Sequence, residues 1–268
     1  MTLTPSLRNS LRTADRNADR NAARIRVIAH RGASYEHPEH TLAAYRQAVA
    51  DGADGLECDV RLTADGRLVC VHDRRVERTS DGRGAVSAMT YEELAALDFG
   101  AWKGPAHAGS RVLLFEELLR EALDAPRPVA LAVETKHPSR AGGRLEAELV
   151  RTLREHGLAD GRSGLVEVMS FSRTALNRMH RLAPGLPAVH LVERRLRPVR
   201  PPYATHAGPG IDLVRRDPGL VARLRAKGLG VRVWTVDEPE DVELCLRLGV
   251  DAIITNRPRD VRESLPDR

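Results

Sequence analysis

The sequence predicts a closed (β/α)8 barrel, and three observations support this fold class. Short apolar runs alternate with amphipathic helical patterns from residue 25 onward. The chain has 268 residues, a length at which such barrels commonly form a single domain. No glycine-rich phosphate-binding loop follows any apolar run, which argues against the main alternative, a doubly wound nucleotide-binding sheet.

Eight apolar runs have the length of barrel strands. They are rich in Val, Ile, Leu and Ala, as expected for parallel strands that are covered on both faces. We place these strands at residues 25–29, 54–60, 129–134, 164–170, 187–191, 210–214, 229–235 and 251–254. The barrel domain is expected over residues 24–262, preceded by a flexible polar tail over residues 1–23.

Helical patterns lie between these strands. The first has Thr41 as its expected N-cap and Gly52 as its expected stop. The patterns cover residues 41–52, 115–123, 143–157, 172–182, 217–228 and 237–249. The segment RRLRPVRPPY, residues 194–203, is rich in Arg and Pro and is expected to lack a regular helix.

Composition narrows the function classes. The net charge is +5, but residues 1–26 hold six arginines and two aspartates, so the body of the chain is nearly neutral. A general nucleic-acid groove is therefore not expected. The three cysteines form no CxxC pair and are expected to be buried thiols. No apolar run is long enough for a membrane span or a signal peptide, so we expect a cytoplasmic protein without stable membrane insertion.

A hairpin interrupts the alternation after the second strand. Asp65-Gly66 is a strong signal for a two-residue turn. A two-residue loop would pair Arg61 with Cys70 and, further along the ladder, Asp59 with His72. Glu57 lies two residues from Asp59 and shares its face. The turn therefore predicts that Glu57, Asp59 and His72 form a cluster.

Titratable residues end the first three predicted strands. In a (β/α)8 barrel the carboxyl ends of the strands meet at the mouth that carries the active site. His30 and Arg31 end the first strand, while Glu134 and Lys136 end the third, two residues apart on one face. We therefore expect these four side chains to join the cluster on the second strand.

This combination of carboxylates, cationic side chains and histidines predicts a type of reaction. Crowded carboxylates repel one another unless a cation lies between them, and oxygen ligands without cysteine favour Mg²⁺ or Ca²⁺. Arginine and lysine at the same mouth indicate an anionic substrate such as a phosphate ester. Two histidines suit a reaction that needs a general acid and a general base. Together these groups indicate metal-assisted hydrolysis of a phosphate ester.

The motifs resemble those of the glycerophosphodiester phosphodiesterase family. The resemblance rests on HRGASYEHPEHT, GLECDVRLTADGRLVCVHD, AVETK, VRVWTV and GVDAIIT, and it extends over about residues 25–260. It also covers TSDGRGAVSAMTYEELAALDFGAW, which looks like the family's characteristic insertion, here about residues 74–112. Within it, Thr90 and Glu93 form an expected capping box for a short helix that is either a lid or a packed appendage.

The resemblance implies an activity and a role for each motif residue. It implies a (β/α)8 barrel that hydrolyses glycerophosphodiesters to sn-glycerol 3-phosphate and an alcohol with one divalent cation. The implied catalytic acid/base pair is His30 and His72. The implied metal ligands are Glu57, Asp59 and Glu134, and the implied substrate contacts are Arg31, Lys136, Trp234 and Glu39. His40 departs from the pattern, because asparagine is usual at this position.

Several alternatives remain open at this stage. Trp234 suits the barrel core as well as a substrate platform, and Glu134 and Lys136 could form only a salt bridge. His37 and His137 are weak candidates for the rim of the site, and Phe171 for its lining. A lysophospholipase D with the same site, or a non-catalytic phosphoester-binding barrel, would share these motifs.

Overall fold

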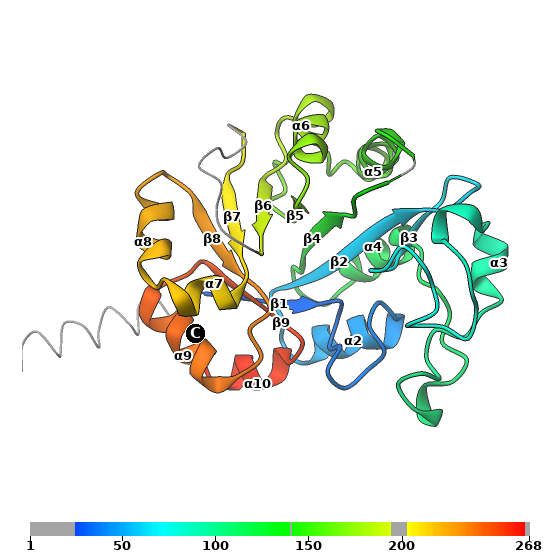
Figure 1. Ribbon diagram of the computed structural model, residues 1–268, viewed down its shortest axis with the longest axis horizontal. Coiled ribbons are helices and arrows are strands. Elements are labelled where there is room, and N and C mark those ends of the chain that lie inside the picture. The colour runs from blue at the N-terminus through cyan, green and yellow to red at the C-terminus, as the bar shows by residue number, and fades with distance from the viewer. Residues whose placement is uncertain (1–24, 140, 194–202, 266–268) are drawn as a thin grey trace, which may run out of the picture.

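The structure is a computed structural model that describes residues 25–139, 141–193 and 203–265. Parallel strands form a ring at its centre, and most of the helices lie outside the ring (Figure 1). The expected tail, residues 1–23, and nearly all of the Arg- and Pro-rich segment 194–203 lie outside the described residues. No helix of the described part is long and apolar enough to cross a membrane.

The sheet is a closed barrel. Its order is β1-β9-β8-β7-β6-β5-β4-β2-β3, and an additional pairing of β1 with β2 closes a ring of eight parallel strands. An open doubly wound sheet is thereby excluded. The ring strands are β1 (Arg26–His30), β2 (Gly55–Leu62), β4 (Ala130–Thr135), β5 (Val166–Ser170), β6 (Ala188–Val192), β7 (His206–Pro209), β8 (Gly230–Val233) and β9 (Ala252–Thr255).

The predicted helices are confirmed within a few residues. Thr41 caps α2, where its hydroxyl accepts a hydrogen bond from the amide of Ala44 at 3.3 Å. The short helices α7 and α10 were not among the predicted patterns. The α-helices are α2 (Leu42–Ala50), α3 (Tyr91–Ala95), α4 (Phe115–Leu123), α5 (Arg144–Glu155), α6 (Arg173–Leu182), α7 (Ile211–Arg216), α8 (Gly219–Arg225), α9 (Pro239–Leu248) and α10 (Pro258–Glu263).

The predicted strand at residues 210–214 is wrong. The strand at this point, β7, occupies His206–Pro209, and residues 211–216 form α7. Ile211 and Val214 are buried three residues apart, which is a helical spacing. The true strand was missed because HAGP contains little apolar side-chain surface.

The hairpin exists, but its predicted register is wrong by one residue. The strand β3 (Leu68–Cys70) runs antiparallel to β2 and pairs Val60 with Cys70. Thr63 donates its amide to the carbonyl of Arg67 at 3.0 Å, so the loop has three residues and ends on Gly66 at φ +84°. The ladder ends at Cys70, and His72 follows it instead of pairing with Asp59.

Buried apolar residues fill the barrel and the layer between its strands and helices. Inside the barrel, Ile28, Met169, Val189 and Ile254 belong to one cluster. The insertion has a separate small core, in which Val76, Val86, Leu94 and Phe99 pack against Val69 and Val71 of the hairpin. The insertion is therefore a packed appendage beside β3 (Figure 1). Its capping box at Thr90 and Glu93 is present, and the three cysteines are buried free thiols.

Candidate active site

The candidate site lies at the carboxyl ends of β1, β2 and β4. β1 ends at His30, and the chain then turns through Arg31 at φ +59° and Gly32 at φ +86°. A side chain on Gly32 would lie 2.6 Å from the carbonyl carbon of Ala44 in α2, so only glycine fits against this helix. The turn directs the chain from the strand into the site.

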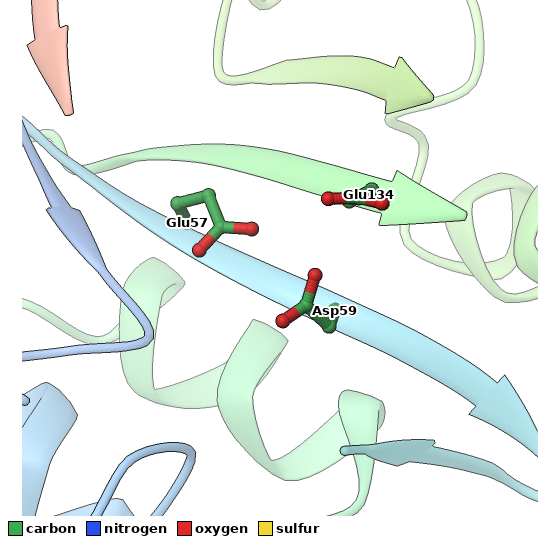
Figure 2. A group of neighbouring side chains, drawn as sticks. All are labelled: Glu57, Asp59 and Glu134. Carbon is green, nitrogen blue, oxygen red and sulfur yellow. The ribbon is translucent and has the colours of Figure 1, made fainter. Parts of the chain in front are cut away.

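Three carboxylates from neighbouring strands meet at this mouth. Asp59 of β2 pairs in register with Glu134 of β4, and Glu57 lies two residues before Asp59 on the same face. Each residue offers one oxygen, and these oxygens lie within 4.8 Å of one another. Figure 2 shows the three side chains gathered over the two strands. All three residues are buried.

The charges of these carboxylates are only partly balanced by the protein. Burial raises the pKa of Glu57 well above its usual value and that of Glu134 to about 8, and the charge of Asp59 adds to both shifts. For Asp59 burial acts in the same direction. This effect of burial is outweighed by the charge of Lys136, by a hydrogen bond from His40 and by the charge of Arg31. Together they keep the pKa of Asp59 well below its usual range.

A divalent cation fits this donor set. The cluster consists of carboxylate oxygens, which are the ligands that Mg²⁺ and Ca²⁺ prefer. One oxygen of Asp59, Oδ1, is buried and accepts no hydrogen bond within the described part of the chain, and its one ion-pair contact there is with Lys136 at 3.3 Å. A cation between the three side chains would satisfy this oxygen and favour the ionised forms of Glu57 and Glu134.

A cavity of about 260 Å³ opens beside the carboxylates. Its polar side is formed by six of the residues that the sequence singled out: His30, Arg31, Glu57, His72, Glu134 and Lys136. Its other side is mainly apolar and includes Met169, Leu191, Ile254 and the rings of Phe171 and Trp234. The cavity thus joins a charged half to an apolar half.

His30 is held through its Nδ1 atom, which lies 2.7 Å from Oδ1 of Asn256. Asn256 donates its amide hydrogens to Asp237 at 2.6 Å, so its oxygen is the acceptor for His30. The proton of a neutral His30 therefore lies on Nδ1, and Nε2 carries the lone pair. Burial and the neighbouring Arg31 lower the pKa of His30 to about 3, so the ring is neutral at pH 7.

His72 has a charged partner instead. Its Nδ1 atom lies 2.8 Å from Oδ1 of Asp73, and Arg78 donates to the other oxygen of Asp73 at 2.5 Å. Arg78 also donates two hydrogen bonds to Glu39, at 2.7 and 2.8 Å. Burial lowers the pKa of His72, whereas the bond to Asp73 acts in the opposite direction.

Arg31 and Lys136 each contact Asp59 and one further carboxylate. Arg31 donates to Glu39 at 2.9 Å, and its Nε lies 3.0 Å from Oδ2 of Asp59. The Nζ atom of Lys136 lies 2.9 Å from Glu134 and 3.3 Å from Asp59. Although burial opposes it, these carboxylates raise the pKa of Lys136, which is therefore charged at neutral pH. The predicted salt bridge to Glu134 is present, and Lys136 also lines the cavity.

His40 makes a contact through each of its two ring nitrogens. Its Nε2 lies 2.9 Å from Oδ2 of Asp59, and its Nδ1 lies 2.8 Å from the hydroxyl of Tyr45. The hydroxyl of Tyr45 donates to the carbonyl of Glu57, so it accepts from His40.

The apolar half of the cavity contains Trp234 and Phe171. Their rings contact edge to face with centroids 5.3 Å apart, and the indole of Trp234 donates to the carbonyl of Gly208 at 2.7 Å. Trp234 therefore belongs to the cavity wall and also packs against the barrel interior. His37 and His137 do not line the cavity; His137 instead contacts Glu146 at 2.9 Å.

Sequence reasoning missed Asn256 and Asp237, which orient His30. Asp237 accepts hydrogen bonds from the Thr255 hydroxyl at 2.9 Å and from the backbone amide of Asn256 at 2.7 Å. The available signal was the position of Asn256 directly after β9, which places it at the same mouth as His30. Glu193 was also missed, although it directly follows β6 and lines the cavity.

Known proteins are similar to this chain in sequence and in fold. Residues 30–260 match the model of the family described as "Glycerophosphoryl diester phosphodiesterase family". The chain belongs to this family. A Mycobacterium tuberculosis protein named "Probable glycerophosphodiester phosphodiesterase 1" is 45% identical over 259 residues, covering 90% of this chain and 92% of that protein. The glycerophosphodiester phosphodiesterase of Bacillus subtilis is 33% identical, with 88% and 84% covered.

Solved structures agree with this membership. An Oleispira antarctica phosphodiesterase, solved in complex with the product sn-glycerol-3-phosphate, matches with a TM-score of 0.80 and 25% identity, covering 89% of this chain and 96% of that one. The glycerophosphodiester phosphodiesterase of Agrobacterium tumefaciens matches with a TM-score of 0.74 and 26% identity, covering 88% and 97%. As a member of the glycerophosphoryl diester phosphodiesterase family, the protein is an enzyme of the phosphoric diester hydrolase class.

Proposed function

We propose that the protein hydrolyses glycerophosphodiesters to sn-glycerol 3-phosphate and an alcohol, using one divalent cation and two histidines. The observation that carries this proposal is the cavity in which two imidazoles and two buried carboxylates line one polar wall, with the third carboxylate beside them. Family membership supports it, as does the related Oleispira phosphodiesterase, which was solved with sn-glycerol-3-phosphate.

In this proposal Glu57, Asp59 and Glu134 hold the cation, either Mg²⁺ or Ca²⁺. When bound, the cation would act as a Lewis acid that polarises a phosphoryl oxygen. Arg31 and Lys136 bind other phosphate oxygens and stabilise charge that develops in the transition state. Glu39 holds the guanidinium of Arg31 in place. Trp234 lies in the apolar half, where it would contact the carbon skeleton of the glycerol.

His30 and His72 divide the proton transfers between them. One accepts a proton from the nucleophile, and the other donates a proton to the leaving alkoxide. The nucleophile is either water or a hydroxyl of the substrate's own glycerol, which would give a transient cyclic phosphate. Fixing Nδ1 of each ring to a neighbouring oxygen leaves Nε2 for these transfers.

An enzyme-coupled assay for sn-glycerol 3-phosphate tests this proposal. Several glycerophosphodiesters would be incubated with the protein in Mg²⁺, in Ca²⁺ and in excess chelator. We expect product with at least one cation, loss of turnover in chelator, and recovery when the cation is restored. Turnover that is unaffected by chelator would contradict the role of the carboxylates. A tight phosphoester complex that forms no product over hours would instead support a binding protein.

A second candidate activity is a lysophospholipase D with the same catalytic groups. It is favoured by Phe171, which lines the cavity and is 42% exposed, because an exposed aromatic ring provides an apolar contact for a lipid. Turnover of glycerophosphocholine and of lysophosphatidylcholine would be compared in the same assay. Faster turnover of the lipid would favour this second candidate.

A further inference from the structure

A second, smaller cavity lies beside the catalytic one. It has a volume of about 30 Å³ and shares Lys136 with the catalytic cavity as a common wall. Its other polar residues are Arg61 of β2, Arg74 at the start of the insertion, and the hydroxyl-bearing Ser87 and Ser139. It therefore joins the insertion to the loops that follow β2 and β4.

The lining of this cavity is cationic, and of its cations Lys136 is paired with Glu134 and Asp59, whereas Arg61 and Arg74 form no ion pair among the described residues. Three cationic side chains and two serines line it, and no carboxylate is among its described lining residues. Arg74 is exposed, and its side chain forms no ion pair or hydrogen bond with another residue in the described ranges. Arg61 donates to the carbonyl of His72, at 3.0 and 2.5 Å, but has no carboxylate partner there either.

Two guanidinium groups held near each other repel unless an anion lies between them. Arginine presents a planar fork of N–H donors that matches the oxygens of a phosphate, and serine hydroxyls can add further donors. A phosphate group is therefore the anion that this set of donors suits best.

The position and size of the small cavity indicate which phosphate group it would bind. The shared Lys136 and the bond from Arg61 to the main chain of His72 place the small cavity on the charged side of the catalytic cavity, whereas Trp234 and Phe171 lie on the apolar side. A volume of about 30 Å³ is the space of roughly two water molecules, which suits the terminal oxygens of one phosphate.

We propose that Arg61, Arg74 and the two serines form an anion subsite that binds a second phosphate carried by the alcohol half of the substrate. The inference rests on the proposed function, since it names a class of substrate for the same site. The preferred substrates would be glycerophosphodiesters whose alcohol bears a phosphate monoester. The scissile phosphate would stay at Arg31 and Lys136, with the second phosphate beyond Lys136.

A matched pair of substrates tests the subsite. Glycerophosphoinositol and glycerophosphoinositol 4-phosphate differ only in the second phosphate, and both release sn-glycerol 3-phosphate in the coupled assay. The informative variant is Arg74→Gln, because Arg74 is exposed and lies outside the proposed catalytic machinery. The control is Arg75→Gln, since the neighbouring Arg75 pairs with Glu77 at 2.5 Å and does not line the cavity.

We expect the wild type to have the higher kcat/KM on glycerophosphoinositol 4-phosphate. Arg74→Gln should lower that value about three- to tenfold, mainly through KM, because it removes a charge-assisted contact that is partly screened by solvent. Turnover of glycerophosphoinositol should be unchanged, and Arg75→Gln should alter neither substrate.

Two other results would separate the claims. If both substrates are hydrolysed with equal kcat/KM and Arg74→Gln affects both alike or neither, the anion subsite is wrong and the proposed function stands. If neither substrate nor any other glycerophosphodiester releases sn-glycerol 3-phosphate, the proposed function fails and the subsite fails with it.

Discussion

Both histidines of the site form a hydrogen bond through Nδ1, but the two partners differ chemically. His30 donates from Nδ1 to the neutral amide of Asn256, whereas His72 donates from Nδ1 to the carboxylate of Asp73. A carboxylate stabilises an imidazolium, and a neutral amide does so much less. The two rings are therefore suited to different protonation states, as a general acid and a general base require.

Removing either ring should abolish most of the activity. We expect His30→Ala and His72→Ala each to lower kcat by about 10²- to 10⁴-fold while the protein stays folded, because a positioned acid or base contributes about that much. The control is His180→Ala, which removes an exposed histidine on α6. The measurement is kcat in the coupled assay, with circular dichroism as the check on folding. Wild-type turnover in either site variant would exclude that ring from the mechanism.

The carboxylate beside His72 should control a limb of the pH–rate profile. Asp73→Asn keeps an oxygen that accepts from Nδ1 but removes the charge, so the pKa of His72 should fall. The corresponding limb of the profile of kcat/KM should move to lower pH, whichever proton transfer His72 performs. The control is Glu77→Gln, which removes an exposed carboxylate of the insertion. A profile that coincides with that of the wild type would contradict this role of Asp73.

At the scale of elements, the turn from β1 into the site depends on close packing against α2. Gly32 meets Ala44 of that helix, and the amide of Ala33 donates to the carbonyl of Ala44 at 2.9 Å. Arg31 precedes Gly32 in a left-handed conformation, and its amide donates to Glu57 at 3.1 Å. The helix, the turn and the carboxylate cluster are thus connected.

Gly32→Ala should therefore destabilise the protein and lower its activity. The added methyl group would lie 2.6 Å from a backbone carbon, in addition to the cost of about 1–2 kcal/mol for φ +86°. The control is Gly109→Ala, which has φ +81° but no neighbour within 4 Å and so carries the conformational cost alone. Chemical denaturation of both variants gives the comparison. Equal losses of unfolding free energy would mean that packing against α2 is unimportant.

The elements also show where sequence reasoning succeeds and where it fails. Apolar runs located seven of the barrel strands because each is covered on both faces, and caps such as Thr41 located helix starts. The strand β7 was missed because HAGP has almost no apolar pattern. The register of the hairpin was missed because loops of two and three residues both use Asp-Gly, and hydrogen bonds of Thr63 decide between them.

At the scale of the whole molecule, the site unites residues that are distant in the sequence. The strand-end rule of barrels placed His30, Glu57, Glu134 and Lys136 at one mouth without knowledge of any contact. The rule gives no side-chain partners, however. The pairing of His30 with Asn256 spans 226 residues, and nothing local in either segment specifies it. The parallel pairing of β1 with β9 brings the two residues together.

The opposite end of the barrel contains a separate polar cluster. Arg232 of β8 makes a bidentate contact with the buried Glu167 of β5, with distances of 3.1 and 3.0 Å, and also donates to Nε2 of His206 at 3.0 Å. Arg26 of β1 lies 3.6 Å from the same carboxylate. Polar groups at the amino-terminal face of such barrels serve stability rather than catalysis. This cluster should therefore affect unfolding and leave turnover unchanged.

His206 makes this stability depend on pH. Burial and Arg232 lower the pKa of His206 to about 4, whereas the unfolded side chain titrates near its usual 6.5. The unfolded state therefore binds a proton that the folded state does not, and the stability contributed by neutral His206 is lost as pH falls from about 6.5 towards 4. Although burial opposes it, Arg232 and Arg26 lower the pKa of the neighbouring Glu167, so this carboxylate stays ionised beside His206 in the folded protein.

His206→Gln should remove this dependence. Glutamine has no proton to gain and can still accept from Arg232 through its side-chain oxygen. Between pH 7 and pH 5 the wild type should lose about 2 kcal/mol more unfolding free energy than the variant, as measured by urea denaturation at each pH. Other groups, including His30, titrate equally in both proteins and cancel in this difference. Parallel stability curves would mean that His206 takes up its proton as readily in the folded barrel as in the unfolded chain.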